Sequence, residues 1–215
     1  MRYRFIRTGA AAPSRRDGEI EIYAVADYRY RHCLTYLSSA LQSPTAYRAG
    51  VGIVLVNPHG LVFIGRRSDN RDFPWQMPQG GLQDGETPEQ GARREVWEEL
   101  GIEAVTVIER RTDWLSYDYP ENFTSRRAAR YRGQRHRWFL LRFDGEDGAI
   151  RFDGAHPEFS AWRWTTPAEA IALVVPFKQM VYRKVLRSFA PAISAMALRQ
   201  SLAVADSGRS RRLRV

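Results

Sequence analysis

The sequence predicts an α/β fold in which helices pack on a mixed sheet to form a sandwich. Gly50–Val56 is a continuous apolar run rich in β-branched residues, which is typical of a strand buried on both faces. Pro88–Leu100 has the periodicity and the flanking residues of an amphipathic helix. Further strand and helix patterns interleave along the chain, and this order favours the α/β class.

The other elements are expected in the following order. The turn Asn57–Gly60 leads from the first strand into a return strand over Leu61–Arg66. Thr87 forms a capping box with Gln90 at the start of the first helix, and Gly101 is placed to end that helix in the left-handed conformation. The remaining elements are strands over Val105–Ile108, Trp114–Tyr117, Trp138–Phe143 and Phe159–Trp164 and helices over Pro167–Val174 and Phe177–Phe189, the last closed by Pro191.

The chain divides into three parts by sequence pattern. Residues 1–46 carry no motif and are expected to form a poorly ordered N-terminal extension. Residues 47–190 carry the strand and helix patterns; with hydrophobic residues at 44% of the 215-residue chain, one well-packed domain is expected there. Residues 191–215 are expected to form a mobile basic tail that contains Arg209, Arg211, Arg212 and Arg214.

Charge and cysteine content limit the class of protein. Lysine and arginine number 33 against 24 aspartate and glutamate residues, and this net charge of +9 favours polyanionic partners such as RNA or nucleotides. No apolar run reaches the roughly 20 residues that a membrane-spanning helix needs, so no membrane partner is expected. Cys33 is the single cysteine, which excludes an internal disulfide and leaves the cytoplasm as the expected location. We expect a monomer that does not act on DNA.

The helix over Pro88–Leu100 carries the candidate catalytic chemistry. Glu95, Glu98 and Glu99 are spaced i, i+3 and i+4, so their carboxylates project from one helix face. A cluster of glutamates is most often a solvated acidic face. Three convergent carboxylates are also the oxygen ligands that a hard cation such as Mg²⁺ or Mn²⁺ prefers. We interpret the cluster as a divalent-metal site.

Residues beside the cluster agree with this interpretation. The pair Gly80-Gly81 precedes the helix and lets the backbone approach closely, so the carbonyl of Gly80 is a further candidate ligand. Arg94 can hold a carboxylate from outside the site through a bidentate hydrogen bond. The metal site would therefore be supported from its side by a cation.

The spacing of these residues resembles the signature of a known family. The Nudix box is matched at every fixed position, by Gly80, Glu86, Arg94, Glu95, Val96, Glu98, Glu99, Gly101 and Ile102. Segments outside the box are similar to those of RNA 5′-pyrophosphohydrolases, a subgroup also described as dinucleoside polyphosphate hydrolases: Trp75–Gly81, Trp138–Leu141, Pro157–Phe159 and Phe177–Arg183. The resemblance covers about Tyr47 to Phe189 and implies a Nudix α/β/α sandwich around a mixed β-sheet.

The resemblance also implies roles for particular residues. The metal ions, Mg²⁺ in the first place with Mn²⁺ or Zn²⁺ able to replace it, would be bound by Glu95, Glu98, Glu99, Glu158 and the carbonyl of Gly80. The catalytic residues would be Glu98, Glu99 and Glu158. The substrate would be held at its phosphates by Arg48, Arg67 and Lys178 and at a base by Val175 and Phe177. The implied reaction is Mg²⁺-dependent hydrolysis of a phosphoanhydride bond, with removal of pyrophosphate from the 5′-triphosphate end of RNA as the leading case.

Several alternatives stay open at this level. Val175 and Phe177 could instead be ordinary core residues at the start of a helix. The basic run Arg126–Arg137 has the composition of a loop, which could guide an RNA body or be a solvated charged segment. Pro74 and Pro176 stand where small polar residues are expected, which leaves base preference open. Hydrolysis of a diadenosine polyphosphate would use the same site, whereas a non-catalytic nucleotide-binding or RNA-binding module is disfavoured because every box glutamate is present.

Overall fold

A computed structural model describes residues 46–69, 72–152 and 157–212, with side chains as far as residue 203. The extension predicted over residues 1–46 therefore lies almost wholly outside the described residues. The elements are β1 (Tyr47–Val56), β2 (Val62–Arg67), β3 (Trp75–Gln76), β4 (Gln79–Gly81), α2 (Pro88–Leu100), β5 (Val105–Arg110), β6 (Leu115–Asp118), β7 (Gly133–Phe143), the 3₁₀ helix η1 (Asp147–Ala149), β8 (Phe159–Thr165), α3 (Pro167–Leu173), the 3₁₀ helix η2 (Pro176–Lys178) and α4 (Gln179–Arg212).

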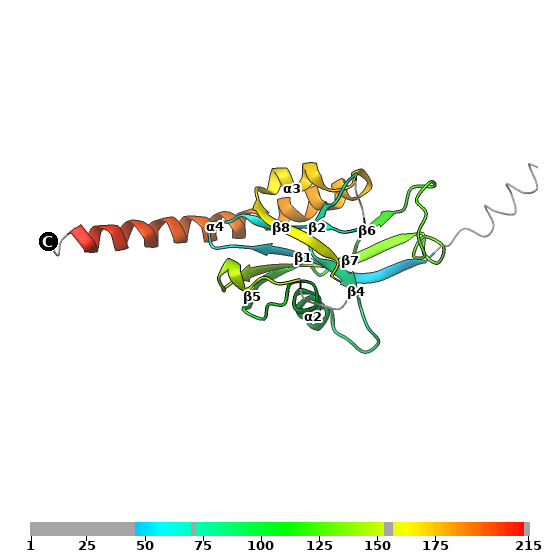
Figure 1. The fold of residues 1–215 in the computed structure, drawn as a ribbon, viewed down its shortest axis with the longest axis horizontal. Helices are drawn as coiled ribbons and strands as arrows, with labels where there is room; N and C mark the ends of the chain where they lie inside the picture. The colour runs from blue at the N-terminus through cyan, green and yellow to red at the C-terminus, as the bar shows by residue number, and fades with distance from the viewer. Residues whose placement is uncertain (1–45, 70–71, 153–156, 213–215) are drawn as a thin grey trace, which may run out of the picture. The chain divides into compact units, whose positions relative to one another are not determined.

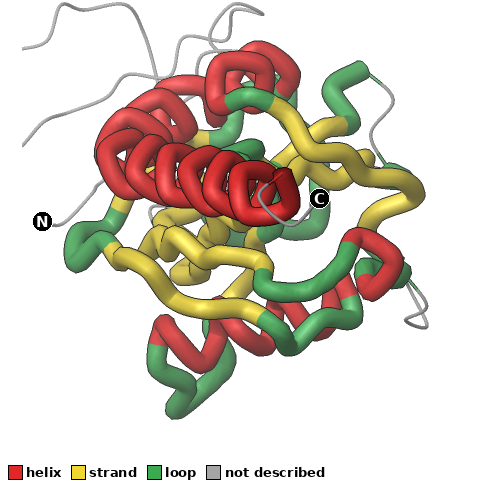
Figure 2. The backbone as a smooth tube through the Cα atoms, turned by 90° about the vertical axis from the view of Figure 1, so that its left-hand side faces the viewer, coloured by secondary structure: helices red, strands yellow, loops and turns green. Residues whose placement is uncertain are grey.

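Within the described residues, eight strands form one mixed sheet, which runs through the middle of the fold (Figures 1 and 2). The central strands β1 and β7 are parallel, from Tyr47 opposite Gly133 to Val56 opposite Arg142. The other pairs are antiparallel. The order along the sheet is β3-β2-β1-β7-β5, with β4 beside β1, β6 beside β7 and β8 beside β2.

The two faces of the sheet carry separate cores, because alternate side chains of a strand point to opposite faces. Helix α2 packs on one face, and α3 with the first part of α4 packs on the other (Figure 1). The core under α2 includes Val51, Ile53, Leu55, Ala92, Val96, Leu100, Phe139 and Leu141, and the core under α3 and α4 includes Val54, Val56, Val62, Trp138, Leu140, Val181, Val185 and Phe189. This arrangement confirms the predicted α/β/α sandwich around a mixed sheet.

Helix α2 begins and ends where the sequence predicts. The hydroxyl of Thr87 accepts a hydrogen bond from the backbone of Gln90, and the side chain of Gln90 accepts one from the backbone of Thr87, which completes the capping box. Gly101 has a φ of 68°, the left-handed conformation that favours glycine, and its N–H bonds to the carbonyl of Trp97. The caps fix both ends of the helix that carries the candidate carboxylates.

Strand β7 is longer than predicted. It begins at Gly133, so the basic run Arg126–Arg137 is a loop only in its first part, and the expectation of a loop over the whole run is wrong. The strand persists because it pairs with β1 on one side and β6 on the other. Arg135 and Arg137 stay out of the core and place their guanidinium groups 5.0 and 5.2 Å from the ring centroid of Trp114.

The expectation that Pro191 closes the last helix is also wrong. Helix α4 starts at Gln179, after η2, and continues through Pro191 to Arg212. A proline in a helix interior removes one backbone hydrogen bond. Burial of apolar side chains on both sides of it offsets that loss, since Phe189 and Ile193 both lie in the core. None of the described helices is long and apolar enough to cross a membrane.

Candidate active site

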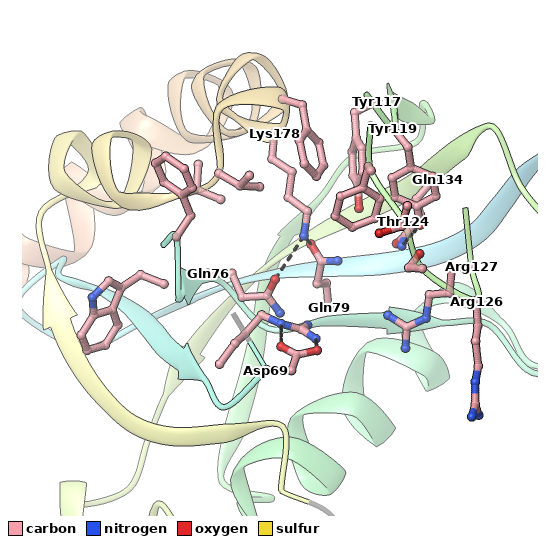
Figure 3. A pocket seen from close by; sticks show the side chains of 18 residues that line it. Asp69, Gln76, Gln79, Tyr117, Tyr119, Thr124, Arg126, Arg127, Gln134 and Lys178 are labelled. Carbon is pink, nitrogen blue, oxygen red and sulfur yellow. Dashed lines mark hydrogen bonds and ion pairs between the residues drawn. The ribbon is translucent and has the colours of Figure 1, made fainter. Parts of the chain in front are cut away.

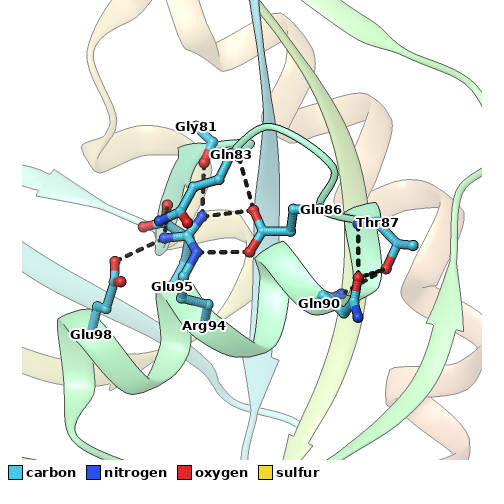
Figure 4. Close-up of polar contacts among 8 residues, drawn as sticks. All are labelled: Gly81, Gln83, Glu86, Thr87, Gln90, Arg94, Glu95 and Glu98. Carbon is cyan, nitrogen blue, oxygen red and sulfur yellow. Dashed lines mark hydrogen bonds and ion pairs between the residues drawn. The ribbon is translucent and has the colours of Figure 1, made fainter.

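Arg94 is the centre of a charged network on α2 (Figure 4). Its Nε and Nη2 atoms donate to the two carboxylate oxygens of Glu86 at 2.8 and 3.0 Å, a bidentate pair. Its Nη1 donates to Glu95 at 2.9 Å and to Glu98 at 2.8 Å, and Nη2 also donates to the carbonyl of Gly81 at 2.9 Å. One guanidinium therefore ties the helix to the loop before it, and it lowers the pKa of Glu86.

Glu99 follows Glu95 by one helical turn, and among the described residues no ion pair holds its carboxylate. Its side chain is buried, and among the described residues neither carboxylate oxygen has a hydrogen-bond partner. Burial raises the pKa of Glu99 well above the usual value, and the neighbouring carboxylates of Glu158 and Glu95 raise it further. Burial likewise raises the pKa of Glu95, although Arg94 opposes the shift.

Gly80 brings the main chain of β4 against these carboxylates. A Cβ atom at position 80 would lie 1.9 Å from the carboxyl carbon of Glu95, so no larger residue fits without displacing that group. A Cβ atom on Gly50, in the neighbouring strand β1, would lie 2.2 Å from the carbonyl oxygen of Gly80. Two glycines thus permit the close approach that a backbone ligand beside Glu95 requires.

Glu158 reaches the cluster from a distant part of the sequence. It precedes β8, and the antiparallel pairing of β8 with β2 sets it beside Arg67 at the end of β2. Its Oε1 accepts hydrogen bonds from Nη1 of Arg67 and, at 3.1 Å, from Nε2 of Gln76. The antiparallel pairing therefore brings a fourth glutamate to the helix carboxylates, as the sequence resemblance implies.

The donor set fits a divalent cation. Glu95 and Glu158 both lie close enough to Glu99 to raise its pKa, and among the described residues the two oxygens of Glu99 are buried without a hydrogen-bond partner. A cation bound there would offset the cost of this burial. Within the described residues no three acidic or histidine side chains are already arranged as a ligand set. Arg94 forms ion pairs with Glu95 and Glu98, and Arg67 forms one with Glu158. Glu98 is the most exposed of the four, with 44% of its side chain accessible.

A cavity of about 520 Å³ lies on the side of the sheet that carries α3 and η2 (Figure 3). Arg67, which holds Glu158, is part of its wall. Lys178 is buried in that wall, and its ammonium donates to Oε1 of Gln76 at 3.1 Å and to Oε1 of Gln79 at 3.3 Å. Burial lowers the pKa of Lys178 to about 7, and the charge of Arg67 contributes to the decrease. The cavity thus contains a cation whose charge is easily lost.

Aromatic rings form another part of the cavity wall, beside Lys178, whose ammonium lies 5.5 Å from the ring centroid of Tyr117. Tyr119 and Phe123 are stacked, with centroids 5.0 Å apart and planes at 21°. Phe177 meets Phe123 at 5.5 Å and Tyr117 at 5.6 Å in tilted or edge arrangements. Phe123 is 37% exposed, so part of this wall is open to solvent. Rings at the mouth of a cationic cavity suit a planar base attached to phosphates.

Comparison with known proteins decides the family. The profile described as NUDIX domain matches residues 46–189. The chain belongs to the Nudix family. The RNA pyrophosphohydrolase of Cereibacter sphaeroides is 47% identical to this Nudix protein over 148 residues, which are 67% of this chain and 91% of the relative. The RNA pyrophosphohydrolase of Novosphingobium aromaticivorans is 49% identical over 148 residues, 66% of this chain and 92% of the relative.

A solved structure shows the same fold. The dihydroneopterin triphosphate pyrophosphohydrolase of E. coli superposes with a TM-score of 0.50 and 22% identity, over 65% of this chain and 97% of that chain. At this identity the likeness concerns the Nudix fold alone.

The predicted substrate residues do not all lie in the cavity of the Nudix site. Arg67, Val175, Phe177 and Lys178 line the cavity. Val175 and Phe177 also pack against the core, so these two residues line the cavity and contribute to core packing at the same time. Arg48 is not among the described residues that line the cavity: its guanidinium covers Gly81, where a Cβ atom would lie 2.0 Å from Nη2.

Several cavity residues were not predicted. Gln76 and Gln79 lie in a segment that resembles the subgroup. The sequence alone does not show which groups a glutamine side chain contacts, so it gave no sign of their role. The rings of Tyr117, Tyr119 and Phe123 come from β6 and the loop after it. Aromatic residues in or beside a polar loop were the one signal in the sequence that pointed to them. The basic loop contributes Arg126 and Arg127 to the cavity.

Proposed function

We propose that this Nudix protein is an Mg²⁺-dependent hydrolase that removes pyrophosphate from the 5′-triphosphate end of RNA. The observation that carries the proposal is the contact between Arg67 and Glu158, which joins the buried carboxylates to a cavity walled by cations and aromatic rings. The relatives named RNA pyrophosphohydrolase support the choice of substrate, since this chain spans about nine tenths of their length at 47–49% identity.

The residues would divide the work as follows. Glu95, Glu98, Glu99, Glu158 and the carbonyl of Gly80 would hold the metal ions. Bound Mg²⁺ would neutralise phosphate oxygens and lower the pKa of a bound water. Lys178 and Arg67 would bind the phosphates, with Arg48 acting from the side of Gly81. Phe177 and Val175 would stack against a base, and Glu158, which lies between the carboxylates and the cavity, would accept the proton of the attacking water.

A direct assay tests the proposal. Purified protein with Mg²⁺ is given triphosphorylated RNA and diadenosine tetraphosphate side by side, and the products are resolved. We expect monophosphorylated RNA, with kcat/KM for RNA at least about tenfold above that for the dinucleotide. A higher value for the dinucleotide would reassign the substrate to the dinucleoside polyphosphates, and no turnover of either would contradict the reaction class. Mn²⁺ or Zn²⁺ in place of Mg²⁺ identifies the preferred ion.

Two further properties stay predictions. A monomer is expected, and sedimentation of the purified chain would measure it. A cytoplasmic location is expected from the cysteine content, and fractionation of cells that express the chain would test it.

A further inference from the structure

We propose that Gln76 is a positioning residue that couples Lys178 in the cavity to Glu158 at the carboxylate cluster. The inference rests on the proposed function, because it concerns a substrate-binding lysine and a glutamate of the metal site. It goes beyond that function because it assigns to one buried amide the role of fixing the positions of Lys178 and Glu158 relative to each other.

The geometry places Gln76 between two opposite charges. Its Oε1 accepts a hydrogen bond from Nζ of Lys178 at 3.1 Å, which Figure 3 shows, and its Nε2 donates to Oε1 of Glu158 at 3.1 Å. The residue is 3% exposed, so water does not compete for either bond. One amide thus joins a cation from η2 to an anion that precedes β8.

The chemistry of the two partners fixes the orientation of the amide. An ammonium group can only donate hydrogen bonds, and a carboxylate can only accept them. A rotated amide would set its oxygen against the carboxylate of Glu158 and its NH₂ group against the ammonium of Lys178, losing both bonds. Gln76 therefore has a single favourable orientation as long as both partners are charged.

The backbone around Gln76 is held in place by β2 and α4. Gln76 pairs with Gly65 in β2, the N–H of Arg67 donates to the carbonyl of Pro74 at 2.7 Å, and the N–H of Met77 donates to the hydroxyl of Tyr182 in α4 at 2.9 Å. A side chain on such a fixed backbone can transmit position from one partner to the other.

Gln79 provides a matched control within the same site. It is also a buried glutamine, and its Oε1 also accepts a hydrogen bond from Nζ of Lys178, at 3.3 Å. Among the described residues, its side chain has no hydrogen bond to Glu158. Changes at position 79 therefore leave the bond to Glu158 in place, whereas changes at position 76 perturb Lys178 and Glu158 together.

The isosteric variants Gln76→Glu and Gln79→Glu separate the two effects. Each keeps an oxygen for Lys178, so both should change KM by a similar factor. Only Gln76→Glu loses the donor to Glu158 and sets a second anion against it, so its kcat should fall about 10- to 100-fold further than that of Gln79→Glu. Equal effects on kcat in the two variants would overturn the proposal.

A double variant tests whether Gln76 acts through Glu158. In a Glu158→Gln background, adding Gln76→Glu should lower kcat no further, because the interaction is already broken. A second full decrease of about 10- to 100-fold would show that Gln76 acts by another route and would contradict the proposal.

A binding measurement keeps the inference separate from the proposed reaction. The affinity of the protein for Mn²⁺ alone can be measured from the electron paramagnetic resonance signal of the free ion. Gln76→Ala should weaken Mn²⁺ binding several-fold, and Gln79→Ala should not, whether or not RNA is a substrate. If the wild-type protein hydrolyses neither RNA nor dinucleotide, the proposed function fails and this comparison still decides the role of Gln76. Equal Mn²⁺ affinities in the Gln76→Ala and Gln79→Ala variants would contradict the proposed role of Gln76.

Discussion

The carboxylate of Glu99 is unfavourable to the folded protein in the absence of a cation. It is buried, both of its oxygens lack partners among the described residues, and two other glutamates lie close by. An unsatisfied buried group of this kind typically costs about 1–3 kcal/mol, more when it is charged. Such local instability is common where a site must bind a charged ligand, since binding then offsets the cost.

At Glu99 we therefore expect the change Glu99→Gln to separate stability from activity. With saturating Mg²⁺, turnover should fall at least about 100-fold, because a metal ligand loses its charge. With EDTA at pH 8, the variant should melt several degrees higher than the wild type, at about 2–4 °C per kcal/mol. Near-normal turnover would contradict the metal assignment.

The pH dependence of stability checks the same residue. The pKa of Glu99 is raised on folding, so the folded protein binds the proton more tightly than the unfolded chain. The penalty is absent below the ordinary carboxyl pKa of about 4.3 and grows as the pH rises through the raised value. The difference in melting temperature between Glu99→Gln and wild type should accordingly be large at pH 8 and vanish near pH 4.

At Lys178 we expect a pH effect on substrate binding. With its pKa near 7, the ammonium is charged below pH 7 and neutral above it in the free protein. The kcat/KM, which reports on the free enzyme, should therefore fall as the pH rises above about 7. Lys178→Arg keeps its charge and should lack that decrease. Identical pH profiles for the two proteins would exclude Lys178 as the titrating group.

At the scale of single elements, removing a ring from the aromatic wall and removing a cation from the cavity should change the rates on different RNA ends in different ways. Phe177→Ala removes stacking of about 1–3 kcal/mol, so rates on triphosphate and diphosphate ends of the same RNA should fall together. RNAs that differ in their first two bases should converge in rate. Unchanged rates with Phe177→Ala would leave that residue with core packing only.

The cations supply the contrast to that variant. Lys178→Ala and Arg48→Ala remove charge-assisted contacts of about 1.5–3 kcal/mol and should harm a triphosphate end more than a diphosphate end. Arg48 lies over Gly81 and outside the lining of the cavity, so its effect should be the smaller of the two.

Helix α4 offers a prediction about Pro191. A proline inside a helix is up to about 3 kcal/mol less favourable than alanine, and part of this is recovered because proline restricts the unfolded chain. Pro191→Ala should therefore stabilise the protein by about 1–3 kcal/mol, measured by thermal or urea unfolding. Ala195→Gly, in the next turn, should destabilise it by about 1 kcal/mol. A helix that ends at Pro191 would show neither effect.

At the scale of the whole molecule, the pairing of distant strands assembles the site. Helix α2 and its carboxylates belong to one face of the sheet, and the cavity lies on the other. The β2–β8 pair brings Arg67 and Glu158 together and so connects the two. The site therefore depends on the sandwich as a unit.

We expect a deletion of residues 1–41 to leave catalysis nearly unchanged. Every proposed site residue lies between positions 48 and 178, and the family match begins at residue 46. The kcat and KM of the truncated protein, compared with those of the full chain on the same RNA, measure the effect. A soluble truncated protein with collapsed activity would assign a role to the extension.

The sequence alone determined the features that depend on neighbouring residues. The caps of α2, the buried strand β1 and the spacing of Glu95, Glu98 and Glu99 are local, so their patterns were sufficient. Local pattern failed at Pro191, where core packing around Phe189 and Ile193 sustains the helix against the preference of proline.

Only the tertiary structure decided which carboxylate is buried without a hydrogen-bond partner and which residues line the substrate cavity. Arg94 holds Glu95 and Glu98 through local contacts on α2, whereas only the fold buries Glu99 beside Glu158 and leaves it without a hydrogen-bond partner among the described residues. The bridge from Lys178 through Gln76 to Glu158 joins η2, β3 and the start of β8. An amide shows its role only through the charges on either side of it, and those charges come together only when the sheet forms.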